Sequence, residues 1–156
     1  MATMVERLLD AADDLLTSRR SSAAKRRAVS TAYYSVFHGL AKLCADELLP
    51  RADREADEYL RVYRALDHGT AKQAFNLPGS PLRTEPQFKE IGDWLALLQE
   101  QRERADYLPP LPVPFTEARA IQLVAEARKA CAAIDRLSPE DRRTLAVRLL
   151  FKARRS

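Results

Sequence analysis

Apolar residues recur at helical spacing along nearly the whole chain of 156 residues. The clearest example begins after Ser22, where apolar side chains three and four residues apart form one continuous stripe: Val29, Ala32, Tyr33, Val36, Phe37, Leu40 and Cys44. This spacing matches the turn of an amphipathic α-helix. The chain has only four glycines, and a β-sandwich or barrel would need more of them for its tight turns. The pattern therefore predicts an all-α fold.

Helix caps and breaks divide this pattern into elements. We expect helices over about 3–17, from Ser21 or Ser22 to about Leu49, from Asp53 to about Phe75, from Thr84 to about Tyr107, from Thr116 onward with Ile121, Val124, Cys131 and Ile134, and over about 139–154. Prolines end two of them, at Pro50 and at the stretch 108–114, because proline cannot continue a helix. Residues 76–86 are predicted to form a loop. These elements favour an up-and-down bundle of four or five helices over 1–137, followed by an extra C-terminal basic helix over 138–156.

Several classes of site are missing from the sequence. No apolar run approaches the roughly 20 residues of a transmembrane helix, and the N-terminal 16 residues carry four acids without the apolar block of a signal peptide. Cys44 and Cys131 show no CxxC spacing and are predicted to be reduced core residues of a cytoplasmic protein. No P-loop, dinucleotide-binding or nucleophile-elbow motif occurs, and two histidines are too few for a His-rich metal site. We therefore expect no cofactor, no metal and no membrane association.

Positive charge gathers in two regions, although the net charge is only +4. The first region is a local cluster at a predicted helix junction: Arg19, Arg20, Lys25, Arg26 and Arg27. A solvated helix face explains such a cluster, and so does a phosphate-binding site, because guanidinium groups bind phosphate oxygens in a bidentate way.

The second region is the C-terminal segment. Residues 128–156 hold nine basic and three acidic side chains, whereas residues 1–127 hold 17 basic and 19 acidic ones. In the last predicted helix the basic side chains are Arg142, Arg143, Arg148, Lys152, Arg154 and Arg155, and they lie opposite Leu145, Val147, Leu149, Leu150 and Phe151. A basic amphipathic helix can bind RNA, an acidic partner or a membrane surface, or it can pack on its own bundle. Because the first 127 residues are slightly acidic, we favour a partner or the bundle over a membrane.

Two motifs carry a resemblance to a known family. The stretch RRAVSTAYYSVFHGLAKL (26–43) resembles the signature second helix of HEPN-domain proteins, and QRERADY (101–107) resembles their later Arg-x-x-Ala-Asp-Tyr motif. A histidine near the start of a following helix (His68) and a capping helix over about 115–137 agree with the same order of elements. The resemblance covers about residues 3–137 and is strongest to the small stand-alone HEPN proteins of bacteria and archaea.

The resemblance implies a helical bundle that commonly dimerises. Active HEPN proteins are metal-independent ribonucleases, in which an arginine and a histidine that follows after four to six residues form a site shared by two protomers. Many are toxins or defence effectors encoded beside a small nucleotidyltransferase that silences them. Others have lost the motif and act as binding or scaffold modules.

The chain departs from the active pattern at one position. Arg102 matches the arginine, but the histidine position is occupied by Tyr107. An imidazole with a pKa near 6.5 can move protons at neutral pH, whereas a tyrosine with a pKa near 10 is a poor base. Arg102 could still stabilise the charge of a phosphoryl transition state. Arg61 and His68 also have the arginine–histidine spacing, but they fall on a different helix from the family site, and we interpret this match as a coincidence.

Asp106 and Tyr107 each allow two interpretations. Arg102 and Asp106 are one helical turn apart and can form an ion pair, but a carboxylate at a helix C-terminus opposes the helix dipole. Asp106 should therefore have a further partner, from this chain or a second protomer, or serve in a site. Tyr107 either staples its helix to the next loop or is a site tyrosine, which in related toxin systems can be adenylylated by the partner enzyme.

His38 is the candidate for the missing imidazole. Tyr33 and Phe37 fit the apolar stripe and are predicted to be core residues, whereas Tyr34 and His38 lie four residues apart on a neighbouring face. His38 is either a hydrogen-bonded core histidine or a group that reaches the Arg102 region from the adjacent helix.

Two functions fit these features. The first is an RNA-cleaving or RNA-binding effector of a toxin–antitoxin or defence pair, with Arg102 at its centre. The second is a non-catalytic HEPN module that binds a nucleotidyltransferase or another protein. A homodimer is expected in both.

Overall fold

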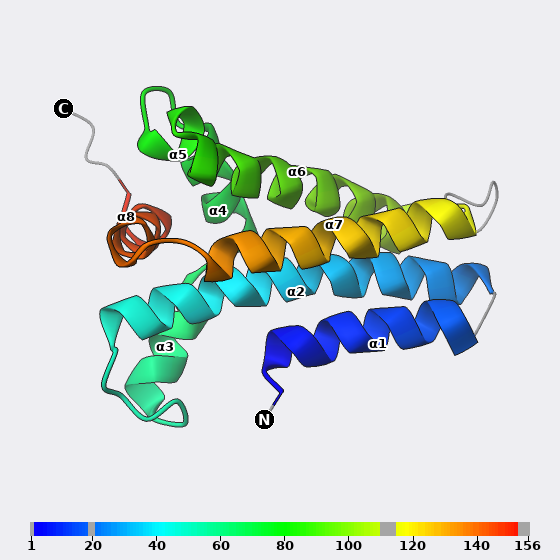
Figure 1. Cartoon of the computed structure of the whole chain (residues 1–156), viewed down its shortest axis with the longest axis horizontal. Coiled ribbons are helices and arrows are strands. Elements are labelled where there is room, and N and C mark those ends of the chain that lie inside the picture. Colours follow the sequence, from blue (N-terminus) through cyan, green and yellow to red (C-terminus); the bar gives the residue numbers. More distant parts are fainter. Residues whose placement is uncertain (1, 19–20, 110–114, 153–156) are drawn as a thin grey trace. The chain divides into compact units, whose positions relative to one another are not determined.

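The described residues of this computed structural model are 2–18, 21–109 and 115–152. They form eight α-helices and no strand, which confirms the predicted all-α helical bundle (Figure 1). The helices are α1 (Met4–Ser18), α2 (Ser22–Leu48), α3 (Asp57–Ala65), α4 (His68–Asn76), α5 (Pro81–Thr84), α6 (Pro86–Tyr107), α7 (Glu117–Asp135) and α8 (Pro139–Leu150).

The chain forms two compact units, each made of segments distant in the sequence. Unit 1 consists of Met1–His38 and Asp93–Ala132, and unit 2 consists of Gly39–Gly92 and Ala133–Ser156. Helices α2, α6 and α7 each contribute residues to both units. The predicted domain division, with a bundle over 1–137 and a C-terminal helix over 138–156, remains a prediction.

Unit 1 is built from α1, the first part of α2, the last part of α6 and most of α7. Its core is formed by buried apolar side chains from all four helices, among them Leu9, Val29, Tyr33, Val36, Leu98 and Leu123. Two polar contacts join pairs of these helices. Arg128 on α7 donates hydrogen bonds to Asp10 and Asp13 on α1, and the Trp94 indole on α6 donates to Glu126 on α7 at 2.7 Å.

Unit 2 is held by a second core and by partly buried polar contacts. Leu40, Leu43, Phe75, Phe88, Ile91 and Leu145 are among its buried apolar residues. Tyr59 on α3 and Lys42 on α2 both donate hydrogen bonds to Asp46, each at 2.7 Å. Burial pushes the pKa of Asp46 upward, but these two hydrogen bonds outweigh it, so the pKa lies below its ordinary value. Arg142 on α8 binds Glu47 on α2 at 3.1 Å.

Three helix starts follow the capping residues that the sequence indicates. The hydroxyl groups of Ser21, Thr116 and Ser138 each accept a hydrogen bond from the backbone N–H three residues later, all at 3.1 Å. Each satisfies one of the N–H groups that a helix start leaves without an intrahelical partner. The starts of α2, α7 and α8 were therefore predictable from local chemistry.

The prediction of one helix from Asp53 to Phe75 is wrong, because the structure has two helices there. Leu66 adopts an extended backbone that ends α3, and Asp67 caps α4 by accepting hydrogen bonds from both the N–H and the hydroxyl of Thr70. Leu66 is itself buried. A strong Asp cap and a buried leucine at the break outweigh the continuing helical pattern. His68 is the first residue of α4, as its predicted place near a helix start requires.

Several smaller predictions from the sequence, about Thr84, Ile121 and the last helix, differ from the structure. Thr84 does not cap α6, since it ends α5 and its hydroxyl donates to the Ser80 carbonyl at 3.2 Å. Ile121 on α7 is 51% exposed and does not join the core. Helix α8 ends at Leu150 and not near residue 154, which lies outside the described residues. Two of its predicted apolar residues, Val147 and Phe151, are exposed.

The prediction of reduced core cysteines is confirmed. Cys44 and Cys131 form no disulfide and are both buried, and burial raises the pKa of the Cys44 thiol to about 12. Among the residues that the structure describes, no helix is long and apolar enough to cross a membrane.

The close approach of α6 to Phe75 predicts opposite effects of alanine at two glycines. A Cβ at Gly92 would lie 2.7 Å from Cδ1 and 2.9 Å from Cγ of the buried Phe75 ring, whereas at Gly69 on α4 its nearest neighbour would be 3.5 Å away. We expect Gly92→Ala to lower the free energy of unfolding by about 1–2 kcal/mol, because overpacking exceeds the gain in helix propensity. Gly69→Ala, the control, should be neutral or stabilising. Urea unfolding monitored by circular dichroism measures both, and an unchanged midpoint for Gly92→Ala would contradict the close packing.

Candidate functional site

Arg102 lies in the last turns of α6 and packs against two tyrosines of α2. The carbon at the centre of its guanidinium group is 5.1 Å from the ring centroid of Tyr33 and 5.8 Å from that of Tyr34. The two rings themselves meet edge to face, with centroids 5.4 Å apart. The structure thus joins the two motifs of the family resemblance, since one supplies the cation and the other the aromatic rings.

The Arg102 side chain is largely buried in this setting, with only 12% of it exposed. Its Nε atom is buried and has no hydrogen-bond partner among the described residues. A guanidinium over aromatic faces gains about 1–2 kcal/mol from each good cation–π contact when it is partly desolvated. Burial alone would lower the pKa of Arg102, but Tyr34, Tyr33 and Asp106 raise it, and the net direction is upward. Arg102 therefore keeps its charge inside a mainly aromatic site.

The carboxylate of Asp106 does form the predicted ion pair, with its Oδ2 atom 3.4 Å from Nη1 of Arg102. The positive charge that compensates the end of α6 comes from a second arginine, Arg26 on α2. Its guanidinium donates hydrogen bonds to three backbone carbonyls, those of Ala105 at 3.0 Å, Leu108 at 2.7 Å and Pro109 at 2.5 Å. These carbonyls lie at or beyond the helix end, where intrahelical donors run out. Arg26 is thus a C-cap for α6.

Tyr107 is 76% exposed, so little of its side chain is packed against other residues. It lines a shallow pocket of about 460 Å³ together with Leu108, two arginines and two glutamates, which are Arg102, Arg104, Glu100 and Glu103. The two guanidinium groups and two carboxylates balance each other. Sequence reasoning identified Arg102 and Tyr107 but missed the two glutamates. Glu103 is four residues before Tyr107 and Glu100 is four residues before Arg104, and this spacing, which places side chains on one helix face, was a usable signal.

His38 packs beside Phe37 on α2, with ring centroids 6.3 Å apart. Burial lowers the pKa of His38 from its ordinary value of 6.5, so the imidazole is neutral at pH 7. It lies one helical turn beyond Tyr34, whereas the cation and ring contacts of Arg102 are with Tyr33 and Tyr34. The predicted role of His38 as a base in this site stays a prediction.

The structure describes three of the five residues of the predicted basic cluster, and these three have different surroundings. Arg19 and Arg20 lie outside the described residues. Arg26 caps α6, Lys25 is half-buried, and Arg27 is exposed. A phosphate that bound here would have to compete with three carbonyls for Arg26.

The second arginine–histidine pair with the spacing of the family motif, Arg61 and His68, belongs to unit 2. Arg61 on α3 pairs with Asp57 at 2.7 Å, and His68 is the first residue of α4.

The described residues contain no group of three or more histidine, cysteine or carboxylate side chains that could hold a metal ion. Comparison of the chain with models of protein families, with curated proteins and with solved structures found no match. The site itself combines a buried cation on two rings, an exposed tyrosine, a second arginine and two glutamates.

The carbonyl contacts of Arg26 predict a clear loss of stability on truncation. Arg26→Ala leaves the last carbonyls of α6 without their charged donor, and we expect the free energy of unfolding to fall by about 2 kcal/mol. Arg27→Ala changes the neighbouring, exposed residue of the same helix and is the matched control, for which we expect little change. Equal urea midpoints for the two variants would contradict the capping role.

The lowered pKa of His38 predicts how stability depends on pH. The unfolded imidazole takes up a proton near pH 6.5, and the folded one only at lower pH. Its contribution is therefore fully present above about pH 6.5 and is lost as the pH falls through the folded value. We expect the difference in unfolding free energy between pH 7 and pH 5.5 to be smaller in His38→Gln than in the wild type. His68→Gln is the control, and an identical pH dependence in wild type and His38→Gln would contradict burial of the neutral imidazole.

Proposed function

We propose that this chain is a non-catalytic, HEPN-like interaction module that associates with a second copy of itself through the end of α6. The observation that carries the proposal is the exposed Tyr107 ring on a pocket whose two arginines and two glutamates balance in charge. Tyrosine and arginine are enriched among the residues that dominate protein–protein binding energy. Leu108, 42% exposed, adds an apolar side chain beside Tyr107.

The charge pattern favours a protein over RNA as the occupant of this surface. A phosphodiester backbone is recognised by an excess of positive charge, and here Glu100 and Glu103 would face its phosphates. Arg102, the cation that the family resemblance makes central, is already packed on Tyr33 and Tyr34 and paired with Asp106. Moving it onto a phosphate would give up these contacts.

The same pattern suits a second copy of the chain. In a two-fold symmetric interface the same surface of both protomers meets. Every contact is therefore made twice, and the surface must be complementary to itself. A patch that exposes both acids and a base meets that condition, because Glu100 or Glu103 of one protomer can face Arg104 of the other. A nucleotidyltransferase partner, which the resemblance also suggests, has no comparable support in the charges of this patch.

Charge reversal at two neighbouring exposed residues tests the proposal. Glu103→Arg gives a patch with excess positive charge, and Arg104→Glu gives one with excess negative charge. We expect the wild type to dimerise, each variant alone to associate at least about tenfold more weakly, and an equimolar mixture of the two to recover dimers, because their patches are complementary. Sedimentation equilibrium measures all three.

The controls separate this surface from general effects. Tyr107→Ala should weaken the dimer, whereas Ile121→Ala, which removes an exposed apolar side chain of α7 in the same unit, should not. A monomeric wild type, or a mixture no better than the single variants, would overturn self-association. RNA cleavage in the presence of EDTA that Arg102→Ala abolishes would overturn the non-catalytic part and establish the ribonuclease alternative.

A further inference from the structure

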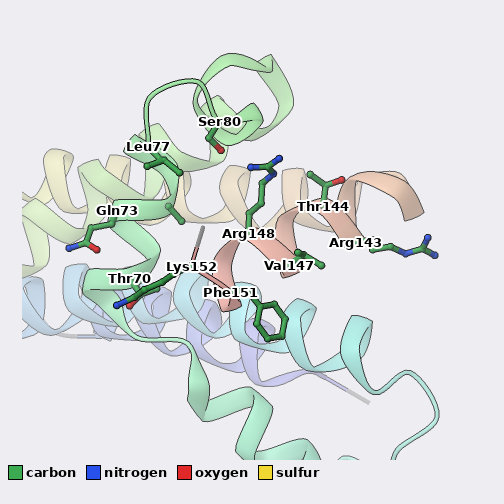
Figure 2. Close-up of a pocket in the computed structure, with 11 residues that line it drawn as sticks. Thr70, Gln73, Leu77, Ser80, Arg143, Thr144, Val147, Arg148, Phe151 and Lys152 are labelled. Atoms are coloured by element: carbon green, nitrogen blue, oxygen red, sulfur yellow. The ribbon is translucent and has the colours of Figure 1, made fainter. Parts of the chain in front are cut away.

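A groove in unit 2 has a composition unlike that of the Tyr107 pocket. It has a volume of about 880 Å³ and lies between α4 and α8, which pack against each other (Figure 2). Thr70, Gln73 and Leu77 line one side, and Val147, Arg148 and Lys152 are among the residues that line the other. Helix α4 is a separate helix because the chain breaks at Leu66 and restarts at Asp67.

The groove exposes large apolar side chains. Val147 is 49% exposed, Phe151 is 57% exposed, and Leu77 is 44% exposed. Val147 and Phe151, the residue that follows α8, are four positions apart and both line the groove, while Leu145 and Leu149 of α8 are buried in the core. Helix α8 is thus apolar on two sides, and its own bundle covers only one of them.

The charged residues that line the groove are all basic. Arg143, Arg148 and Lys152 all line the groove, and none of its lining residues carries a carboxylate. Neither Arg143 nor Arg148 has an ion-pair partner among the described residues. The adjacent Arg142, by contrast, pairs with Glu47 within the unit. Two arginines beside exposed apolar side chains are therefore available to a ligand.

We propose that this groove binds an acidic amphipathic helix of a partner protein. Such a helix would lay its apolar side chains on Leu77, Val147 and Phe151 and direct its carboxylates to Arg143, Arg148 and Lys152. Helix α8 has 12 residues and is about 18 Å long at the rise of an α-helix, which is enough for about three turns of a partner. Arg143 lies one turn before Val147, and Arg148 and Lys152 follow Val147 and Phe151 directly in the sequence, so basic residues flank the apolar ones along the groove.

Two other classes of partner fit the groove less well. RNA would use the cations but would leave the apolar side chains against water or phosphates. A membrane surface would need an apolar helix face that protrudes into the lipid, whereas these residues line a hollow between two helices. This inference concerns unit 2 and does not depend on self-association at Tyr107.

The direct test is a selection from a displayed library of helical peptides, with surface positions randomised over acidic, basic, polar and apolar residues. The full-length protein is the bait, and the Val147→Asp variant is used to remove peptides that bind elsewhere. We expect the enriched peptides to be acidic, with apolar residues at spacings of three and four. Failure to enrich any peptide, or enrichment of neutral or basic ones, would overturn the proposal.

Matched variants then locate the site with one synthesised peptide from the selection. We expect Val147→Asp and Arg148→Glu each to weaken binding about tenfold or more. The controls make the same chemical changes at exposed positions of unit 2 outside the groove: Leu48→Asp and Arg136→Glu should retain wild-type affinity. Circular dichroism confirms that each variant is folded, and equal losses in variants and controls would overturn the assignment of the site.

The other partner classes are tested with the same variants. Single-stranded poly(U) RNA and vesicles of phosphatidylcholine with phosphatidylglycerol are offered to the wild type and to Arg148→Glu. We expect no binding that depends on Arg148. If either probe binds more tightly than the selected peptide, and Arg148→Glu abolishes that binding, the groove serves RNA or lipid and the proposal is wrong.

Discussion

The capping of α6 by Arg26 is the contact on which the candidate site depends. A helix that stops before a proline-rich stretch leaves several carbonyls without donors, and burying them without partners would be costly. Arg26 supplies donors to three carbonyls from α2 and so ties the end of one helix to the side of another. With that register held, Arg102 lies over Tyr33 and Tyr34, and Tyr107 is left facing solvent.

Local sequence signals were sufficient for most of the helices and for one site contact. Ser138, followed by proline and two acids, predicts the start of α8 because all the atoms involved lie within one turn. The Arg102–Asp106 pair follows from helical spacing for the same reason. The break at Leu66 was missed because it depends on burial of that side chain, which only the folded unit determines. The function of Arg26 was missed because its partners are about 80 residues away in the sequence.

The two units present different surfaces. In unit 1 the pocket at the end of α6 mixes acids and bases around an exposed aromatic ring. In unit 2 the groove between α4 and α8 combines apolar side chains with positive charge alone. Sequence composition indicated the basic C-terminal region but could not separate the arginine that is used internally, Arg142, from its neighbour Arg143, which lines the groove. That distinction depends on the position of Glu47, far away in the sequence.

The buried state of the cysteines has a practical consequence. A thiol reacts with alkylating reagents as the thiolate, and the Cys44 thiol is both buried and shifted to a pKa of about 12. Cys131 is also buried. A cysteine introduced at an exposed position would therefore be the reactive thiol of the folded protein. A fluorophore or spin label could be attached there without first replacing Cys44 and Cys131.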